Sequence, residues 1–414
     1  MEGRFTIKRQ NMFSLLVLWI WAQGILLQYI RALITRFPII GWYPDVVLTV
    51  FFVAIVLLAL PYFRISKSDI LLVFSIIAVF MLEWIFYKDG QEYLDKYIVT
   101  FVVRILPLYF VGVSLGEAEE RKKIIDQMYI ISVVTLFSSI AYRFAFGASM
   151  SDAVSKYVGD MDHAYKLLPH LCLIAYYAVK KTNVLNVVGA AIGGLYLLML
   201  GTRGAALLYL VFIALLLIMG RSSKGAVARI VVVFGTVGGF IASPWYDAAV
   251  LWMSQKAQQF GLSVRIFDKL IAGEVAISVG RDTIRETLLY SIKENPFFGN
   301  GLCSDRVLAG NYAHNMALEL WTEFGVIFGT VILIAVVVVL FRGYKATKEE
   351  GEKGLILALI FASFFKLFLS GSYLDERLLL LLLGLCVCSI RQAKRNQMLL
   401  AQDMPCDCFT EVSR

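Results

Sequence analysis

The chain has 414 residues, of which 59% are hydrophobic and only 17% are charged. Its mean hydropathy is +0.74, and long apolar runs are separated by short basic loops. Soluble globular domains carry more charge and break their apolar residues into shorter runs. The composition therefore excludes a soluble protein and predicts one all-α integral membrane domain over residues 1–414, a polytopic bundle of transmembrane helices.

Apolar runs long enough to form membrane-spanning helices recur along the whole chain. A helix needs about 20 residues to cross about 30 Å of hydrocarbon. We expect about twelve spans, and counts of eleven or thirteen stay open because two runs are short and Pro44 interrupts another. The expected spans lie near residues 12–30, 40–60, 69–87, 97–115, 124–142, 165–179, 184–200, 205–220, 227–243, 316–341, 355–371 and 374–390.

Basic residues are concentrated in alternate loops. If the N-terminus is cytoplasmic, every inside loop carries lysine or arginine, whereas outside loops such as 88–96 and 371–377 are mixed or acidic. The positive-inside rule then places both termini, including the polar tail 391–414, in the cytoplasm. Because topology accounts for most of the net charge of +8, nucleic acid is not an expected partner. The basic inside segments lie near residues 4–9, 64–67, 121–123, 180–181, 221–229, 342–353 and 391–395.

Two outside segments, 143–164 and 244–314, are too long to be simple connections. Loops of this length are commonly functional. Within the larger, periplasmic loop, apolar residues recur at near-helical spacing over 246–272, with Trp245 and Trp252 as expected interfacial anchors. A second helix is expected over Asp282–Glu294, ended by an Asn-Pro pair. We therefore expect a large helical loop that holds the chemistry.

Two arginines lie at the start of this second expected helix. Arg281 and Arg285 are four residues apart and share one side of it. Planar guanidinium groups match phosphate oxygens, and a helix N-terminus favours anions, so the pair suits a diphosphate. The alternative is a solvated pair balanced by Asp282 and Glu286.

The large loop ends in a His-Asn pair at the mouth of the expected span 316–341. His314 can act as a general base near neutral pH, and Asn315 can orient it or a sugar hydroxyl. The alternative is an interfacial polar pair without chemistry. His163 and His170 are the only other histidines and are expected to be structural, so no metal site is predicted.

Further charges lie toward the outer ends of expected spans. Arg104 interrupts the span 97–115 and must face protein or a water-filled interior. Arg203 occupies the tight outside turn of the GTRG motif. A single cation, Lys366 above all, can instead extend its side chain to the interface. Several cations at one membrane face nevertheless favour a pocket for an anionic lipid headgroup.

The order of these motifs resembles the O-antigen ligase/polymerase family of bacterial glycan-assembly membrane proteins. The likeness rests on GTRG between two spans, a long outer loop, an arginine helix leading into NPFFGNG, and AHN before a span beginning ALELWTEFGVIFG. It covers residues 183–345, whereas the first half agrees only in hydropathy. The resemblance implies a bundle similar to the GT-C glycosyltransferase fold.

The resemblance implies a glycosyltransferase, independent of metals and cofactors, that uses undecaprenyl-diphosphate-linked glycans at the outer face of the bacterial inner membrane. In this assignment, Arg203 and Arg281 bind the diphosphate leaving group, and His314 deprotonates or orients the acceptor hydroxyl. The lipid diphosphate is already an activated leaving group, so no nucleotide sugar is needed. The secondary substrate-binding candidates are Arg285, Asn315 and Arg104.

The resemblance leaves the acceptor open. A polymerase joins repeat units of O-antigen, capsule or exopolysaccharide, with a chain-length regulator as a possible partner, whereas a ligase transfers the glycan to lipid A-core. The stretch GNYAHN has one histidine where the ligases often have a second, which favours the polymerase. A flippase for lipid-linked oligosaccharides is the main alternative of another class, but transporters have repeat-related halves and midplane charges.

Overall fold

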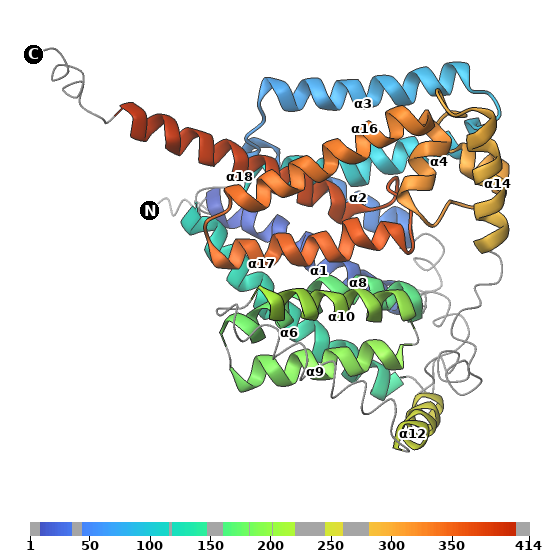
Figure 1. Cartoon of the computed structure of the whole chain (residues 1–414). Helices are drawn as coiled ribbons and strands as arrows, with labels where there is room; N and C mark the ends of the chain where they lie inside the picture. Colours follow the sequence, from blue (N-terminus) through green and yellow to red (C-terminus); the bar gives the residue numbers. More distant parts are fainter. Residues whose placement is uncertain are drawn as a thin grey trace, which may run out of the picture.

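The computed structural model describes residues 9–34, 44–115, 118–146, 160–181, 183–200, 202–219, 245–259 and 281–402. Within these ranges every regular element is helical, and no strand occurs. Most of the long helices run in similar directions, and their connections gather at two ends of the molecule (Figure 1). The predicted all-α class is confirmed.

Helices lie where the hydropathy pattern predicts them. The first half contains α1 (Arg9–Ile34), α2 (Pro44–Ala59), the 3-10 turn η1 (Leu60–Tyr62), α3 (Lys67–Phe86), α4 (Gln91–Thr100), the π-helical turn η2 (Phe101–Ile105), α5 (Leu106–Ser114), α6 (Ala118–Phe146) and α8 (Asp160–Lys180). The second half contains α9 (Val184–Met199), α10 (Arg203–Ile218), α12 (Trp245–Gln259), α14 (Arg281–Glu294), α15 (Ser304–Ala309), α16 (Met316–Ala346), α17 (Glu350–Leu359), the π-helical turn η4 (Ile360–Phe364), the 3-10 turn η5 (Phe365–Phe368) and α18 (Arg377–Gln402). The expected span 227–243 lies outside the described residues.

Among the described residues, four helical segments are long and apolar enough to cross a membrane. Among them, α3 turns most of its apolar side chains outward, including Leu71, Phe74 and Phe86. An exposed apolar face of this size suits contact with lipid rather than water. The composition of these helices is that of a membrane protein, and the count of about twelve spans stays a prediction. The four segments are Lys67–Phe86, Gln91–Ser114, Glu119–Tyr142 and Met316–Ala346.

The helix α8 forms much of the buried core and packs against α6, α9, α10 and α17. Both histidines that the sequence assigns to structural roles are buried on it. The Nδ1 atom of His170 lies 3.1 Å from the hydroxyl of Ser132, and Nδ1 of His163 lies 2.8 Å from the amide oxygen of Gln28. These hydrogen bonds satisfy the imidazole groups within the core, as a structural role requires.

The NPFFGNG motif packs against a break in α16. The break lies at Gly325, whose φ of 77° and ψ of 166° are not helical. A Cβ atom at this position would lie 2.3 Å from the carbonyl oxygen of Phe297, so both the backbone conformation and the close approach require glycine. Backbone hydrogen bonds join the motif to both sides of the break: Asn300 to Thr322 (2.8 Å), Gly301 to Glu323 (3.0 Å) and Val326 to Pro296 (2.7 Å).

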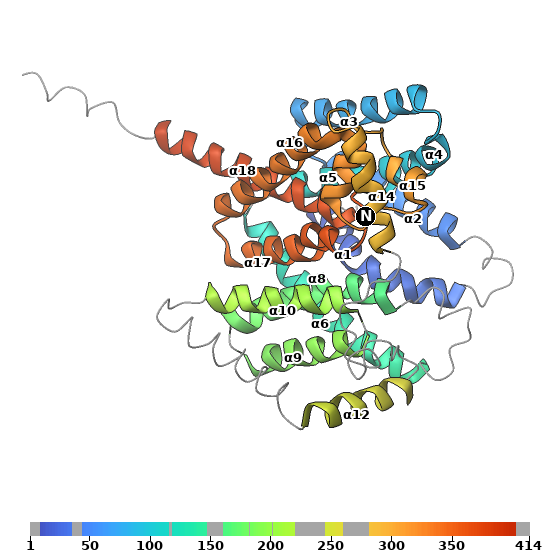
Figure 2. The same cartoon turned by 45° about the vertical axis from the view of Figure 1, so that its right-hand side comes forward.

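The large loop is helical where it is described. The helix α12 covers the first part of the expected amphipathic segment and lies at the edge of the bundle beside α9 (Figure 2). Its Trp245 and Trp252 side chains are exposed, which fits interfacial anchors. The remaining part of the segment, residues 260–280, lies outside the described residues. At the other end of the chain, α18 continues through the predicted tail as far as Gln402.

Candidate functional site

The helix α14 begins at Arg281 and ends at Glu294, before the Asn-Pro pair, as the sequence predicts. Its buried residues Leu288 and Ile292 face the bundle, where α14 contacts α16, while Arg281 and Arg285 are exposed. The guanidinium Nη1 of Arg281 donates a hydrogen bond to the carbonyl oxygen of Leu369 (3.0 Å). This bond ties the start of α14 to the segment 366–372, which comprises most of η5 and the residues after it and is here termed the 366–372 turn.

His314 lies beside this arginine in an unusual backbone conformation, with φ of 55°. Its ring contacts that of Tyr312 in a tilted arrangement, with centroids 3.9 Å apart and an angle of 48° between the ring planes. The Nδ1 atom is buried and has no hydrogen-bond partner among the described residues. Burial and the nearby charge of Arg281 lower the pKa of His314 to about 4. The imidazole is therefore neutral at pH 7, the form that a general base requires, and its lowered pKa makes it a weaker base than an ordinary histidine.

Asn315 is the N-cap of α16. Its side-chain oxygen accepts hydrogen bonds from the backbone N–H groups of Ala317 (3.0 Å) and Leu318 (3.2 Å). Its side-chain nitrogen donates to the carbonyl oxygen of Phe368 (3.3 Å). In the structure, Asn315 thus caps a helix and holds the start of α16 on the same turn as Arg281. The sequence suggests that Asn315 orients His314 or a sugar hydroxyl, and none of these three hydrogen bonds goes to His314.

Arg203 is exposed at the start of α10, which contacts η5. The next residue, Gly204, lies against the turn: a Cβ atom there would be 3.9 Å from Cβ of Leu369 and 2.1 Å from the hydroxyl of Tyr165. The second glycine of GTRG therefore permits a close approach of α10. The structure brings Arg203, Arg281 and His314, which are widely separated in sequence, to the surroundings of one turn.

Two candidates lie apart from these contacts. Arg285 lies one helical turn further along the exposed face of α14. Arg104 lies on the π-helical turn η2, which packs against α2, α4, α5 and α18. Its partly buried position fits the sequence expectation that it faces the protein interior.

A buried ionic cluster, which sequence reasoning missed, lies beside the turn. Arg306 is only 3% exposed, and three carboxylates surround it. Burial alone would lower the pKa of Arg306, but the carboxylates outweigh it and raise this pKa above its ordinary value. The contacts of its Nη1 atom are Asp305 (2.5 Å), Glu319 (2.8 Å) and Glu323 (3.7 Å), and its guanidinium lies 4.8 Å from the ring centroid of Tyr97. We call Asp305, Arg306, Glu319 and Glu323 the Arg306 cluster.

The Arg306 cluster forms hydrogen bonds with the backbone next to His314 and with the end of the 366–372 turn. Asp305 accepts a hydrogen bond from the backbone N–H of Ala313 (2.9 Å), the residue before His314. On the other side, Ser372 accepts a hydrogen bond from Nη2 of Arg306 (2.5 Å) and donates its own to Glu319. The cluster therefore fixes the backbone of His314 and the end of the 366–372 turn. The sequence signal for this cluster is Glu319 and Glu323, two acids four residues apart in an otherwise apolar helix. Acids in such a helix require partners, which indicates a buried ion-pair network.

The same carboxylates are the group of potential metal ligands found among the described residues. Oxygens of Asp305, Glu319 and Glu323 lie within 4.8 Å of one another. However, Nη1 of Arg306 contacts all three and supplies the positive charge that a cation would bring. The donor set therefore fits an internal ion-pair network better than a metal site.

A cavity of about 220 Å³ adjoins the turn. Tyr165, Lys366 and Ser372 belong to its wall, together with the ion pair Asp162–Lys166 (2.5 Å). Lys366 pairs with Glu376, and its nitrogen lies 5.5 Å from the ring centroid of Tyr165. The extension of this side chain to the membrane interface stays a prediction. This mixed lining offers donors and acceptors to a hydroxyl-rich ligand.

The chain matches no protein-family model, no curated protein and no solved structure. The likeness to the O-antigen ligase/polymerase family thus rests on the ordered motifs alone. The geometry around the 366–372 turn is an independent ground for a functional proposal.

Proposed function

We propose that the chain is a membrane glycosyltransferase that polymerises undecaprenyl-diphosphate-linked repeat units at the outer face of the bacterial inner membrane. The observation that carries this proposal is the convergence of Arg203, Arg281 and His314 around the 366–372 turn. Two exposed guanidinium groups at helix starts suit a diphosphate, and a neutral imidazole beside them suits proton removal. The resemblance in motif order supports the same reaction.

In the proposed reaction, the acceptor hydroxyl attacks the anomeric carbon of the donor glycan. A new carbon–oxygen bond forms while the bond from the anomeric carbon to the diphosphate breaks. Arg203 and Arg281 stabilise the negative charge that grows on the departing diphosphate. His314 accepts the hydroxyl proton, which its neutral state at pH 7 permits.

The surroundings of these residues fit such a reaction. The Arg306 cluster holds the backbone before His314 and the end of the turn, so the base and the diphosphate site keep a fixed separation. The polar cavity beside Tyr165 gives space for sugar units next to the turn. Transfer to lipid A-core would use the same donor site, and only the acceptor would differ.

The deletion phenotype tests this function and separates the alternatives. Loss of a polymerase leaves single repeat units attached to the acceptor, and loss of a ligase leaves full-length glycan on the lipid carrier. Loss of a flippase leaves lipid-linked single units that external enzymes cannot reach. We expect the first pattern, detected by gel separation of the glycans and by analysis of the lipid-linked pool. An unchanged glycan profile would contradict all three functions.

A further inference from the structure

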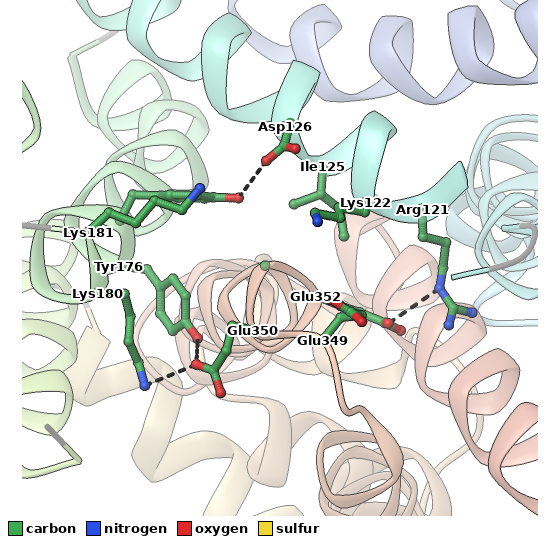
Figure 3. Close-up of a pocket in the computed structure, with 12 residues that line it drawn as sticks. Arg121, Lys122, Ile125, Asp126, Tyr176, Lys180, Lys181, Glu349, Glu350 and Glu352 are labelled. Atoms are coloured by element: carbon green, nitrogen blue, oxygen red, sulfur yellow. Dashed lines mark hydrogen bonds and ion pairs between the residues drawn. The ribbon is translucent and has the colours of Figure 1, made fainter. Parts of the chain in front are cut away.

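Two cavities use residues from opposite ends of α8. The cavity of about 220 Å³ beside the 366–372 turn includes side chains from the start of α8, and a second cavity of about 280 Å³ includes side chains from its end (Figure 3). The positive-inside rule assigns the start of α8 to the outer side of the membrane and the basic pair 180–181 to the inner side. The first cavity, here termed the outer cavity, therefore lies on the side of the proposed transfer reaction.

The wall of the outer cavity has no net formal charge, because three acidic and three basic residues line it. Asp162 forms an ion pair with Lys166 (2.5 Å), and Glu376 forms one with Lys366. An ionic ligand would bring a charge that this wall does not balance, whereas hydroxyl groups can bind to ionised partners without changing the balance. The cavity therefore favours an uncharged polar ligand. Its charged residues are Asp162, Lys166, Lys366, Asp375, Glu376 and Arg377.

Asp162 gives this wall a hydrogen-bond acceptor. It shares one side of α8 with Tyr165, Lys166 and Pro169, which also line the cavity at helical spacing. Within the described part of the chain, its two hydrogen bonds reach a single oxygen, Oδ2, from Nζ of Lys166 (2.5 Å) and from Nε2 of Gln28 (2.9 Å). The side chain is 56% exposed. The second oxygen, Oδ1, is therefore available to accept a hydrogen bond from a ligand hydroxyl.

A buried chain of hydrogen bonds fixes the position of Asp162. Gln28 is fully buried, and its amide nitrogen donates to Asp162, so its amide oxygen is directed to Nδ1 of His163 (2.8 Å). Nδ1 must then carry the proton and donate to this oxygen, while Nε2 lies 3.5 Å from the hydroxyl of Tyr196. These groups orient Asp162 from the side of the core, as a preorganised binding site requires.

We propose that the outer cavity binds one uncharged sugar unit, with Asp162 as the acceptor for its hydroxyl groups and with Gln28 and His163 as positioning residues. The volume lies below the range of about 300–1,000 Å³ that is usual for drug-sized ligands, which suits a single sugar. Ser372 belongs both to the cavity wall and to the 366–372 turn, so the bound sugar lies next to the proposed diphosphate site. Its identity as the first sugar of the donor glycan rests on the proposed function.

Binding of free sugars tests the cavity without the transfer reaction. Ligand-observed NMR measures the affinity of the full-length protein in lipid nanodiscs for the methyl glycosides of glucose, galactose and N-acetylglucosamine. The charged probes are the methyl glycosides of glucuronic acid and glucosamine. The test variant is Asp162→Ala, and the matched control is Asp126→Ala, which removes a carboxylate from the wall of the cavity at the other end of α8. Melting temperatures show whether each variant folds.

We expect a neutral glycoside to bind the wild type and the control more tightly than either charged probe does. Asp162→Ala should weaken this binding by about tenfold or more, because a hydrogen bond to a charged group is lost. His163→Leu should weaken it by a smaller factor, and His163→Asn, whose amide keeps a donor for Gln28, should restore it. The absence of neutral-glycoside binding, tighter binding of a charged probe, or wild-type affinity in Asp162→Ala would overturn the proposal. Wild-type affinity in His163→Leu would remove the positioning role.

Synthetic farnesyl diphosphate, with and without an attached sugar, tests the link to the proposed function. The attached sugar is the neutral one that binds most tightly in free form. We expect it to increase the affinity of the wild type by about tenfold and Asp162→Ala to abolish only that increase, whereas Arg281→Ala weakens binding of both compounds. If neither farnesyl compound binds while free-sugar binding still depends on Asp162, the proposed function fails and the sugar site stands. A sugar that adds no affinity to the diphosphate would overturn the placement of the two sites side by side.

Discussion

Two arginines at the same end of the bundle have opposite surroundings. Arg306 is 3% exposed and contacts three carboxylates, whereas Arg281 is exposed and donates to the backbone carbonyl of Leu369. A buried charge persists only where partners compensate for its desolvation, so the contacts of Arg306 are needed for folding. Arg281 lies beside His314, whose Nδ1 has no hydrogen-bond partner within the described part of the chain, and keeps donors for a substrate. Burial and pairing, rather than residue type, separate the scaffold from the proposed site.

The largest effect is expected from Arg306→Leu. This change leaves three carboxylates buried without their cation, and breaking a buried pair costs about 3–5 kcal/mol. We expect the variant to be depleted from membranes, as measured by immunoblotting, and to melt at a lower temperature after purification. Arg395→Leu, at an exposed position of α18, should behave as the wild type. Normal amounts of an Arg306→Leu protein with an unchanged melting temperature would remove the scaffold role.

A smaller and purely functional effect is expected from Arg203→Lys. The exposed lysine keeps the charge but loses the planar fork that matches two phosphate oxygens. We expect product formation to fall by about tenfold, and Arg203→Ala to lower it by about 100-fold or more, at normal protein levels. The rate of undecaprenyl diphosphate release in reconstituted vesicles measures both. Full activity of Arg203→Ala would exclude this residue from the site.

The smallest effect concerns pH. Because the pKa of His314 is lowered from its ordinary 6.5 to about 4, the neutral base persists well below pH 6. The acid limb of kcat/KM, which reports the free enzyme, should therefore have its midpoint near pH 4. The unfolded chain binds this proton below about pH 6.5 and the folded chain only near pH 4. The free energy of unfolding therefore decreases as the pH is lowered from about 6.5 to about 4. A midpoint near pH 6.5 that His314→Ala abolishes would show that the environment does not shift the base.

The sequence predicts helices well here because each depends on local composition. Apolar length locates the helices, and an Asn-Pro pair ends α14 after Glu294. The distribution of charge is less readable because it depends on distant partners. Nothing local pairs Arg306 with Glu319 or Ser372, or Lys366 with Glu376.

The candidate site shows the same division. The sequence singles out Arg203, Arg281 and His314, and the fold brings them to one turn. The sequence does not reveal the turn, because Arg281 and Asn315 bind to the backbone carbonyl groups of Leu369 and Phe368, which carry no sequence signature. The polar side chain of Asn315 suggests a substrate contact, yet its oxygen caps the start of α16 and its nitrogen donates to the carbonyl oxygen of Phe368.

The most direct test of the central claim compares Arg281→Ala and His314→Ala in a host that lacks the native protein. Lys293→Ala, an exposed substitution on the same helix α14, is the control. We expect long-chain glycan to fall by about 100-fold or more in both variants, because one loses a charge-stabilising donor and the other the base. Membrane levels of all three proteins should remain normal. An unchanged glycan ladder in Arg281→Ala or His314→Ala, at normal protein level, would contradict the assignment of the transfer site to the 366–372 turn.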